Sequence, residues 1–428
     1  MMQGKLVCMR FVRLSAEAYA SFVHKQSRLF LPQMPEYGIT RVEQGFSVEY
    51  LGVVEGDSHA SERIMGAGIL TIQPWKKAFQ RALMNYGPTL DWSNSELVTT
   101  FFTGLTDFLR MHYPRALAVQ ISPLVPKNRY ADIEVIEECE VGAQADHHLR
   151  ELGYARINKE FYEQSDIQIR YIYTKSIAGM SFEEATATLS KGLRRRFHNE
   201  GRYGVEVRFL GPDEFGVFEQ LHESAAERTE MAGITSSSES LYRSLMEKLG
   251  SQHAFLCVAF YSPKRYIQQI EDEQETVRAR IATVEARKPT KARDRDLHQA
   301  EERLRTLESN HESALESLDE FGDRDIPFNS ALSFISGDEL ILLLGGMDKR
   351  FASYGRDYPV ERAMFKLACD KGLSVYNTFG ITGCFDETAI DAPVLSFKRW
   401  LNGNVEEFIG TYNRPLHPKL ARALGATE

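Results

Sequence analysis

A glycine-free, highly charged segment, residues 263–319, limits the fold of this chain more than any other feature. In each half of the segment, apolar residues recur at steps of three, four or seven, the heptad spacing of helices that pack against one another. Lys288-Pro289-Thr290 separates the halves, and proline interrupts a helix because it lacks an N–H donor and clashes with the preceding turn. We therefore predict an antiparallel helical coiled-coil hairpin whose two helices, of about 20 residues each, extend roughly 30 Å.

The rest of the chain contains two similar series of strands and helices, and the hairpin is inserted within the second series. Runs of β-branched and aromatic residues predict strands, and apolar residues at helical spacing predict helices. The first series has strands at 46–54, 66–73 and 117–121 and a helix at 96–112. The second has strands near 168–173, 205–210, 254–261, 332–335, 339–344 and 373–379, and helices from 182, from 213 and at 360–371. This order indicates a duplicated α/β (α+β) chain.

The helix that starts at residue 182 carries clear signals at both ends. Ser181 and Glu184 have the spacing of a capping box, and Gly201 is placed to end the helix. Between them, three apolar residues recur every four positions: Leu189, Leu193 and Phe197. We therefore predict one continuous helix with a single apolar face.

The length of 428 residues indicates at least two domains, because a domain usually has roughly 100–200 residues. We expect a first α/β domain at 1–165 and a second at 166–263 and 320–412. The hairpin then occupies 264–319, and 413–428 form a C-terminal tail.

The charge balance excludes proteins that coat nucleic acid by bulk positive charge, since 51 basic and 60 acidic residues give a net charge of −9. The five cysteines are widely spaced and never form C-x-x-C, which is typical of reduced thiols. No signal peptide and no apolar run of about 20 residues is present, so we expect a cytoplasmic protein. The histidines show no metal-binding spacing, and we predict no metal site.

A local basic patch stands out against this negative chain. Arg194, Arg195 and Arg196 follow Lys191 and precede Arg202. Such a concentration of cations fits either a phosphate-bearing partner, such as RNA or an anionic membrane, or a solvated helix face. A second, weaker group of basic residues surrounds the predicted hairpin tip.

Two other motifs give weak signals. Arg63 to Gly68 match the R-x-x-G-x-G pattern of loops that bind coenzyme A, but the glycines lead into a predicted strand and not into a helix. Cys139 with His147 and His148 suggests a thiol nucleophile, although an incidental buried thiol is the more common outcome.

The order of several short motifs resembles the FemABX peptidyltransferases, and the FemA branch most. The resemblance covers nearly the whole chain, with the helical hairpin at the expected place. It is carried by Gly87-Pro88-Thr89-Leu90-Asp91, Gly192 to Arg196 followed by Gly204 to Leu210, Gly345-Gly346, Tyr376-Asn377, Gly380 to Gly383, Phe397-Lys398 and Ile409-Gly410.

This resemblance implies two tandem acetyltransferase-like (GNAT-type) domains, with a hairpin similar to the arm of seryl-tRNA synthetase. It also implies transfer of an amino acid from aminoacyl-tRNA to the side-chain amine of the peptidoglycan stem peptide. The acceptor would be lipid II or its UDP-linked muropeptide precursor, and no cofactor is required. Since the donor is already an activated ester, positioned cations matter more than a nucleophile.

The resemblance also implies roles for individual residues. Arg41 and Arg228 align with the cations that bind the phosphates of the precursor, although the family has lysine where this chain has Arg41. Phe397 and Lys398 match a Phe-Lys pair near the tRNA acceptor end, which makes Lys398 the candidate for stabilising the oxyanion or the acceptor phosphate. Tyr358 aligns loosely with a tyrosine of the binding cleft, and Arg194–Arg196 form the patch expected to contact tRNA phosphates.

Some points stay open at this stage. Relatives often have Asp-Pro where this chain has Ser122-Pro123, which leaves the contact to the acceptor amine and any general base unassigned. The sequence does not identify the transferred residue among glycine, serine and alanine, the position in the bridge, or the oligomeric state. A coenzyme A-dependent N-acyltransferase and a non-enzymatic coiled-coil adaptor remain alternatives, and a lipid-linked acceptor would require peripheral contact with the inner membrane surface.

Overall fold

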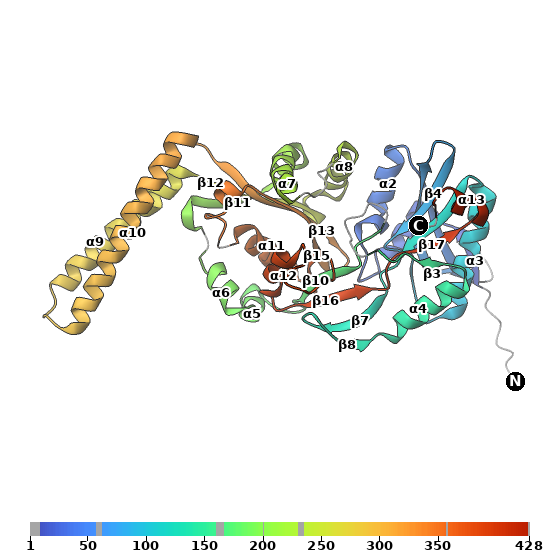
Figure 1. Ribbon diagram of the computed structural model, residues 1–428, viewed down its shortest axis with the longest axis horizontal. Helices are drawn as coiled ribbons and strands as arrows, with labels where there is room; N and C mark the ends of the chain where they lie inside the picture. Colours follow the sequence, from blue (N-terminus) through green and yellow to red (C-terminus); the bar gives the residue numbers. More distant parts are fainter. Residues whose placement is uncertain are drawn as a thin grey trace.

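Two α/β units lie side by side, and a long helical hairpin projects from one of them (Figure 1). The computed structural model describes residues 9–56, 62–159, 167–199, 201–229, 235–356 and 358–426; within α7 it leaves out the side chains of residues 225–229. The arm and the N-terminal unit form opposite ends of an elongated molecule. Among the described residues, no helix is long and apolar enough to cross a membrane.

The first sheet is largely antiparallel and has the order β1-β2-β3-β4-β6-β17-β9, with β5 paired to β3. Only β4 and β6 run parallel within its described part. The strands are β1 (Met9–Arg13), β2 (Ser47–Glu55), β3 (Arg63–Trp75), β4 (Phe79–Asn85), β5 (Thr89–Leu90), β6 (Ala116–Ser122), β9 (Ala155–Arg156) and β17 (Tyr412–Pro415).

The second sheet repeats this plan, with the order β11-β12-β13-β14-β15-β10-β16-β7-β8. Here β14 and β15 are the parallel pair. The strands are β7 (Pro126–Ala131), β8 (Glu134–Glu138), β10 (Tyr171–Ser176), β11 (Val205–Leu210), β12 (Ala254–Tyr261), β13 (Ile326–Ser336), β14 (Glu339–Met347), β15 (Val375–Ile381) and β16 (Asn404–Phe408).

Helices cover the two sheets and connect their strands (Figure 1). The α-helices are α1 (Ala16–Val23), α2 (Pro35–Glu43), α3 (Ser95–His112), α4 (Glu140–Glu151), α5 (Phe182–Ala187), α6 (Lys191–Phe197), α7 (Phe215–Thr229), α8 (Ser236–His253), α9 (Pro263–Glu285), α10 (Lys291–Phe321), α11 (Pro359–Asp370), α12 (Ala392–Arg399) and α13 (Pro418–Ala423). Short 3-10 turns occupy Leu31–Gln33, Arg202–Gly204, Pro212–Glu214 and Lys349–Phe351.

The duplication predicted from the sequence is visible in the connections. A parallel strand pair needs a crossover, and a helix usually supplies it. In the first unit α3 connects β4 to β6, and in the second unit α11 connects β14 to β15. Both helices bury one apolar face against their sheet. This arrangement confirms the predicted duplicated α/β chain with an inserted helical hairpin.

The two units exchange strands, so sheet membership does not follow the predicted residue ranges. β7 and β8 lie within 1–165 but extend the second sheet through β16. β17 begins at the predicted C-terminal tail and pairs with β6 and β9 in the first sheet, and α13 follows it. The predicted boundary at 165 and 166 lies outside the described residues, and the domain limits stay a prediction.

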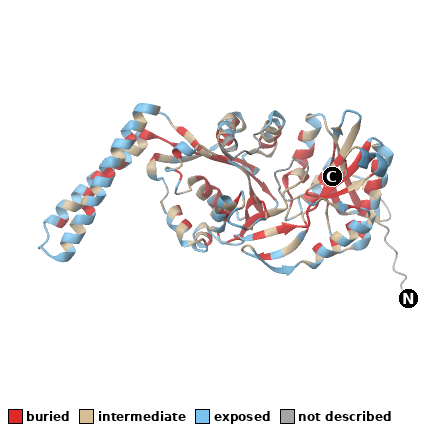
Figure 2. Ribbon diagram, viewed as in Figure 1, coloured by how far each residue is buried: buried red, intermediate tan, exposed pale blue. Residues whose placement is uncertain are grey.

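The arm is a self-contained hairpin of α9 and α10, as the heptads predict. Its own apolar core contains Ile270, Val277, Ala300, Leu307 and Ala314, while most other side chains on the arm are exposed (Figure 2). The turn contains Pro289, and the Thr290 hydroxyl accepts a hydrogen bond from the N–H of Arg293 at the start of α10. The arm therefore has a core separate from those of the sheets.

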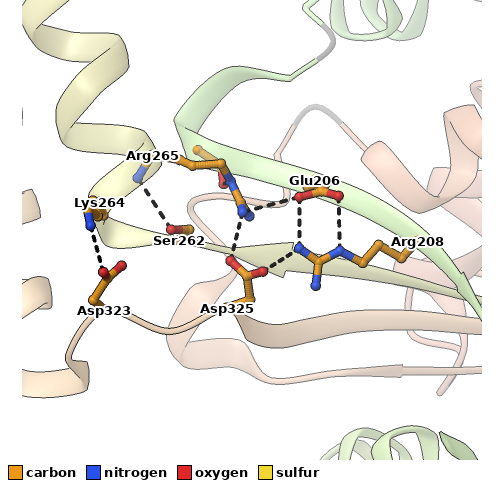
Figure 3. A network of polar contacts seen from close by, with 8 residues as sticks. Glu206, Arg208, Ser262, Lys264, Arg265, Asp323 and Asp325 are labelled. Carbon is orange, nitrogen blue, oxygen red and sulfur yellow. Dashed lines mark hydrogen bonds and ion pairs between the residues drawn. The ribbon is translucent and has the colours of Figure 1, made fainter.

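A network of ion pairs holds the base of the arm against the second sheet (Figure 3). Arg265 at the start of α9 lies 2.8 Å from Asp325 and 3.2 Å from Glu206, and Arg208 contacts the same two carboxylates. Gly204, with φ +65°, allows α9 to come close, because a Cβ there would lie 2.6 Å from the Ser262 carbonyl oxygen. The arm is thus oriented at its base by contacts with β11 and the segment before β13.

The single helix predicted from residue 182 to Gly201 is wrong. The chain forms two short helices, α5 and α6, and each has its own cap. Ser181 and Glu184 form the predicted capping box, but the Ser190 hydroxyl accepts a second capping hydrogen bond from the N–H of Leu193. The predicted apolar residues are still buried on both sides of the break: Leu189, Leu193 and Phe197.

Candidate functional site

Lys398 lies on α12 with its ammonium in a buried site at the end of β15. Its Nζ donates hydrogen bonds to the carbonyl oxygens of Phe379, at 3.1 Å, and Gly380, at 2.7 Å. Only 7% of the residue is exposed. When protonated, lysine has three N–H donors, so one remains for a bound group.

The position of α12 depends on Asp391, which precedes its first residue. The Asp391 carboxylate accepts hydrogen bonds from the Thr382 backbone N–H and hydroxyl, both at 2.7 Å. Thr382 directly follows β15, so these bonds tie the start of the helix to the end of the strand. Lys398 therefore reaches the backbone of β15 from a helix that is anchored to the same strand.

A second buried ionisable group, Glu361 on α11, accompanies Lys398. Tyr376 on β15 donates a hydrogen bond of 2.9 Å to its Oε1. Burial raises the pKa of Glu361 to about 7, against the opposing effects of the Tyr376 hydrogen bond and the Lys398 charge. Burial lowers the pKa of Lys398 to about 7, against the opposing charges of Glu361 and Asp391. Both groups therefore titrate near neutral pH, whereas most lysines and glutamates are fully charged at that pH.

Four residues form an aromatic–arginine cluster that includes Phe397, the residue before Lys398 on α12: Arg196, Tyr358, Phe397 and Trp400. The rings of Tyr358 and Phe397 lie 4.8 Å apart, and those of Tyr358 and Trp400 lie 5.9 Å apart. The Arg196 guanidinium lies 5.2 Å from the Tyr358 ring and 5.1 Å from the Trp400 ring, and it donates to the Arg356 carbonyl oxygen. Flat rings with a cation at their faces bind nucleobases and phosphates well.

The cluster brings together predicted residues that are distant in sequence. Tyr358, with φ +52°, precedes α11, and Phe397 precedes Lys398 on α12. α6 contributes Arg196, whereas Arg194 and Arg195 on the same helix are exposed. The predicted basic patch therefore lies beside the predicted Phe-Lys pair.

The other two predicted cations lie elsewhere. Arg41 is on α2, where its Nε donates 3.0 Å to the Tyr37 hydroxyl and its Nη1 donates 2.9 Å to Gln44. Gln44 in turn donates to the Ser237 carbonyl oxygen on α8, so Arg41 lies where the two units meet. Arg228 is near the end of α7, but its side chain lies outside the described residues.

Several side chains around Lys398 were not singled out from the sequence as site residues: Glu361, Tyr376, Thr382, Asp391 and Trp400. One available signal was Glu361, an acidic residue on the apolar face of α11 that otherwise buries Val360, Met364 and Phe365. A buried carboxylate at such a position needs a polar partner, and this requirement points to a site.

The weaker motifs do not form sites. Gly66 and Gly68 lie inside β3 and not at a helix N-terminus, so they do not present the phosphate-binding loop of an acetyltransferase. Burial raises the pKa of the Cys139 thiol, which opposes activation as a nucleophile. The Ser122 hydroxyl is buried and lies 3.0 Å from the Thr411 hydroxyl. No group of three or more potential metal ligands occurs in the part of the chain that the structure describes.

Comparison with known proteins gives consistent matches over nearly the whole chain. Residues 14–427 match the FemAB family. The aminoacyltransferase FemA of Staphylococcus epidermidis is 25% identical over 421 residues, which is 96% of each chain. FemA of Staphylococcus aureus is 24% identical over 430 aligned positions, 98% of each chain. The crystal structure of FemX superposes with a TM-score of 0.76 at 18% identity and covers 97% of this chain and 99% of FemX, which shows the same fold.

Proposed function

Because this chain belongs to the FemAB family, it is an aminoacyltransferase, and we propose that it takes its aminoacyl group from aminoacyl-tRNA. The acceptor in this proposal is the side-chain amine of a peptidoglycan stem peptide, carried by lipid II or by its UDP-linked precursor. The transferred residue is glycine, serine or alanine. The product is one residue of the bridge between stem peptides.

The observation that carries this proposal is that one helix, α12, carries both the buried Lys398 and Phe397 of the aromatic–arginine cluster. The rings and guanidinium of the cluster suit the terminal nucleotides of a tRNA, since stacking and cation–π contacts accept any base. Arg194 and Arg195, exposed on the same helix as Arg196, supply further contacts to phosphates. In this arrangement the 3′ end of the tRNA lies over the cluster and places its ester near Lys398.

The proposed reaction needs no protein nucleophile. The acceptor amine attacks the ester carbonyl carbon, which forms the C–N bond and a tetrahedral intermediate with negative charge on the former carbonyl oxygen. Collapse of the intermediate breaks the C–O bond to the tRNA ribose. Over the two steps the amine loses a proton and the leaving ribose oxygen gains one. The remaining N–H of Lys398 is suited to stabilise that oxyanion or an adjacent phosphate, and the low water content of a buried site strengthens such a contact.

We assign the diphosphate of the acceptor to Arg41 and Arg228. Tyr37 and Gln44 hold the Nε and Nη1 of Arg41, while its Nη2 makes no hydrogen bond within the described residues. Arg228 lies on α7, one of the row of helices α7, α8 and α2 that runs along one side of the molecule (Figure 1). Guanidinium groups bind phosphate strongly because they present paired donors.

Mass spectrometry of the acceptor tests the proposal. The protein is incubated with charged total tRNA, mixed amino acids, and either the UDP-linked pentapeptide or lipid II. We expect the acceptor to gain the mass of one amino-acid residue, which identifies the residue, and we expect RNase pretreatment to abolish the gain. The proposal is wrong if neither acceptor gains mass, with or without one bridge residue already attached.

A further inference from the structure

Three chain segments come together on one surface of the first unit, at the end of the molecule away from the arm (Figure 1). They are the tip of the β3–β4 hairpin, the residues that lead into β6, and the C-terminal segment with α13. The Gln80 N–H donates to the Arg115 carbonyl oxygen at 3.0 Å, and the His417 ring lies 3.1 Å from the Pro114 carbonyl oxygen. An apolar core beneath the surface joins all three: Leu117, Ala421 and Ala426, with Trp75, Phe79 and Leu424 packed against them. We call this surface the α13 face.

The α13 face is strongly basic in a chain with net negative charge. Residues 74–81, 113–118 and 416–426 contain no aspartate or glutamate. They contain six basic residues: Lys76, Lys77, Arg81, Arg115, Lys419 and Arg422. All of these except Arg81 are exposed. An anionic partner would therefore meet a concentration of positive charge on these three segments.

The backbone at the hairpin tip is unusual for lysine. Lys76 has φ +43° and Lys77 has φ +60°, both in the left-handed region. Hairpin tips normally place glycine or asparagine at such positions, because other side chains are strained there. Strain that persists at a surface position is a reason to look for a function, and here it places two lysines at the outermost point of the hairpin.

Apolar and aromatic groups lie among these cations. The half-buried Trp75 ring has Lys76 Nζ 4.6 Å from its centre and the Arg81 guanidinium carbon 4.7 Å from it. Leu420, on the outer side of α13, is 42% exposed. Tryptophan, lysine and arginine with an exposed leucine form the combination found where proteins contact the headgroup region of a bilayer.

We propose that the α13 face docks the protein on an anionic membrane surface. The charge is complementary to acidic phospholipids, and the exposed Leu420 is placed to enter the headgroup region. RNA is the less suitable partner, because the proposed tRNA site lies in the other unit. This docking rests on the proposed function only in that a lipid-linked acceptor is reached from the membrane surface.

Vesicle flotation tests the proposal with two variants of equal charge change. Lys77→Glu with Lys419→Glu alters the α13 face at two lysines that make no hydrogen bond or ion pair in the described structure. Lys288→Glu with Lys291→Glu makes the same change at the exposed arm tip. The vesicles are phosphatidylcholine alone or with about one third phosphatidylglycerol. Each basic residue near an anionic membrane contributes about fivefold to the partition coefficient, so we expect the first variant to partition about 25-fold or more weakly to the anionic vesicles. The arm-tip variant should match the wild type.

Further conditions of the flotation experiment identify the partner, and a transfer assay separates this proposal from the proposed function. Rising salt and neutral vesicles should both abolish wild-type flotation, and Leu420→Gln should weaken it. No wild-type binding to anionic vesicles, or equal loss in both double variants, overturns the proposal. Reduced retention of total tRNA by the first variant with unchanged flotation assigns the α13 face to RNA instead. Transfer to the water-soluble UDP-linked acceptor should be unchanged in the first variant, so failure of the transferase proposal shows in that assay and not in flotation.

Discussion

Lys398 carries a cation into a site that water hardly reaches, and polar groups from β15, from α11 and from Asp391 at the start of α12 act on it. Two backbone carbonyl oxygens accept its hydrogen bonds, and Glu361 offers a charge that burial tends to neutralise. A preorganised cation of this kind needs no rearrangement when negative charge develops on the substrate, which is how enzymes obtain large electrostatic effects.

Lys398→Met removes this charge while keeping most of the side-chain volume. We expect kcat to fall about 10²–10³-fold, the effect of deleting one donor to an oxyanion, with a smaller change in KM. The measurement is single-turnover transfer from charged tRNA to the UDP-linked acceptor. Lys366→Met on the exposed side of α11 is the matched control and should keep wild-type kinetics. Equal activity of the two variants would remove Lys398 from the mechanism.

Glu361→Gln tests the pairing through the pH dependence of the reaction. Burial lowers the pKa of Lys398 to about 7 although the Glu361 charge opposes this shift, so removal of that charge lowers the pKa further. If protonated Lys398 is the active form, the alkaline limb of the kcat/KM profile moves to lower pH in the variant. An unchanged alkaline limb would contradict the pairing.

The stability of the same variant provides an independent reading. Because burial raises the pKa of Glu361 from 4.5 to about 7, its contribution to stability is complete below about pH 4.5 and is lost as the pH rises through about 7. Urea unfolding at several pH values should show this loss in the wild type and not in Glu361→Gln.

At the scale of the elements, the arm is a unit with its own core. His311 on α10 lies 3.3 Å from Glu271 on α9, so the two helices face each other at this level. Removing residues 273–309 and closing the gap with Gly-Gly keeps the ion pairs at the arm base and removes the distal two thirds of the hairpin. We expect the body to unfold at nearly the wild-type temperature, because the sheet cores make no use of the distal arm.

Transfer assays on the shortened protein then separate an enzyme from an adaptor. An enzyme whose site lies at α6, α11 and α12 keeps transfer to the UDP-linked acceptor, with any loss appearing in KM for charged tRNA. A protein that acts only through its arm would lose all function. Loss of kcat at saturating tRNA would show that the arm contributes to the site itself.

The sequence predicted those elements whose signals are local. The heptads, Pro289 and the Ser181 capping box each act within one or two turns of chain, and the structure confirms them. The break between α5 and α6 was missed because the apolar spacing continues across it, while Ser190 caps a new helix. The Lys398 site was only partly predictable, since Glu361 reaches it from α11, the crossover between the paired strands β14 and β15, and the contact of Asp391 with Thr382 forms only in the folded chain.

At the scale of the whole molecule, the two units share cores as well as strands. One apolar cluster joins residues of α1 and α2 to residues of α7, α8 and β12, and a second contains Phe30, Tyr86, Phe379 and Phe408. Gly337, with φ +57°, permits the turn before β14 to touch the backbone at Ser27. The proposed acceptor site at α2 and α7 and the proposed donor site at α12 are therefore held in one relative position by the junction of the units.

Arg28 makes ion pairs at this junction, and its substitution tests how much they contribute to stability. Its Nε lies 2.7 Å from Glu339 and its Nη1 lies 2.5 Å from Glu406, while the Phe30 and Phe408 rings lie 5.5 Å from its guanidinium. Arg28→Leu leaves the buried Glu339 without its counter-charge. We expect a loss of about 3 kcal/mol in the free energy of unfolding, at the low end for a buried pair because 30% of the Arg28 side chain is exposed.

A double-mutant cycle distinguishes the lost interaction energy of the Arg28–Glu339 pair from the cost of a buried carboxylate without a counter-charge. Glu339 also accepts a hydrogen bond of 2.9 Å from Asn377, and burial raises its pKa against the effect of Arg28. Arg28→Leu combined with Glu339→Gln removes the stranded carboxylate, so the double variant should be more stable in urea than Arg28→Leu alone. Additive losses would mean that Arg28 acts through its packing against the two rings, and the junction would then be held by apolar contacts alone.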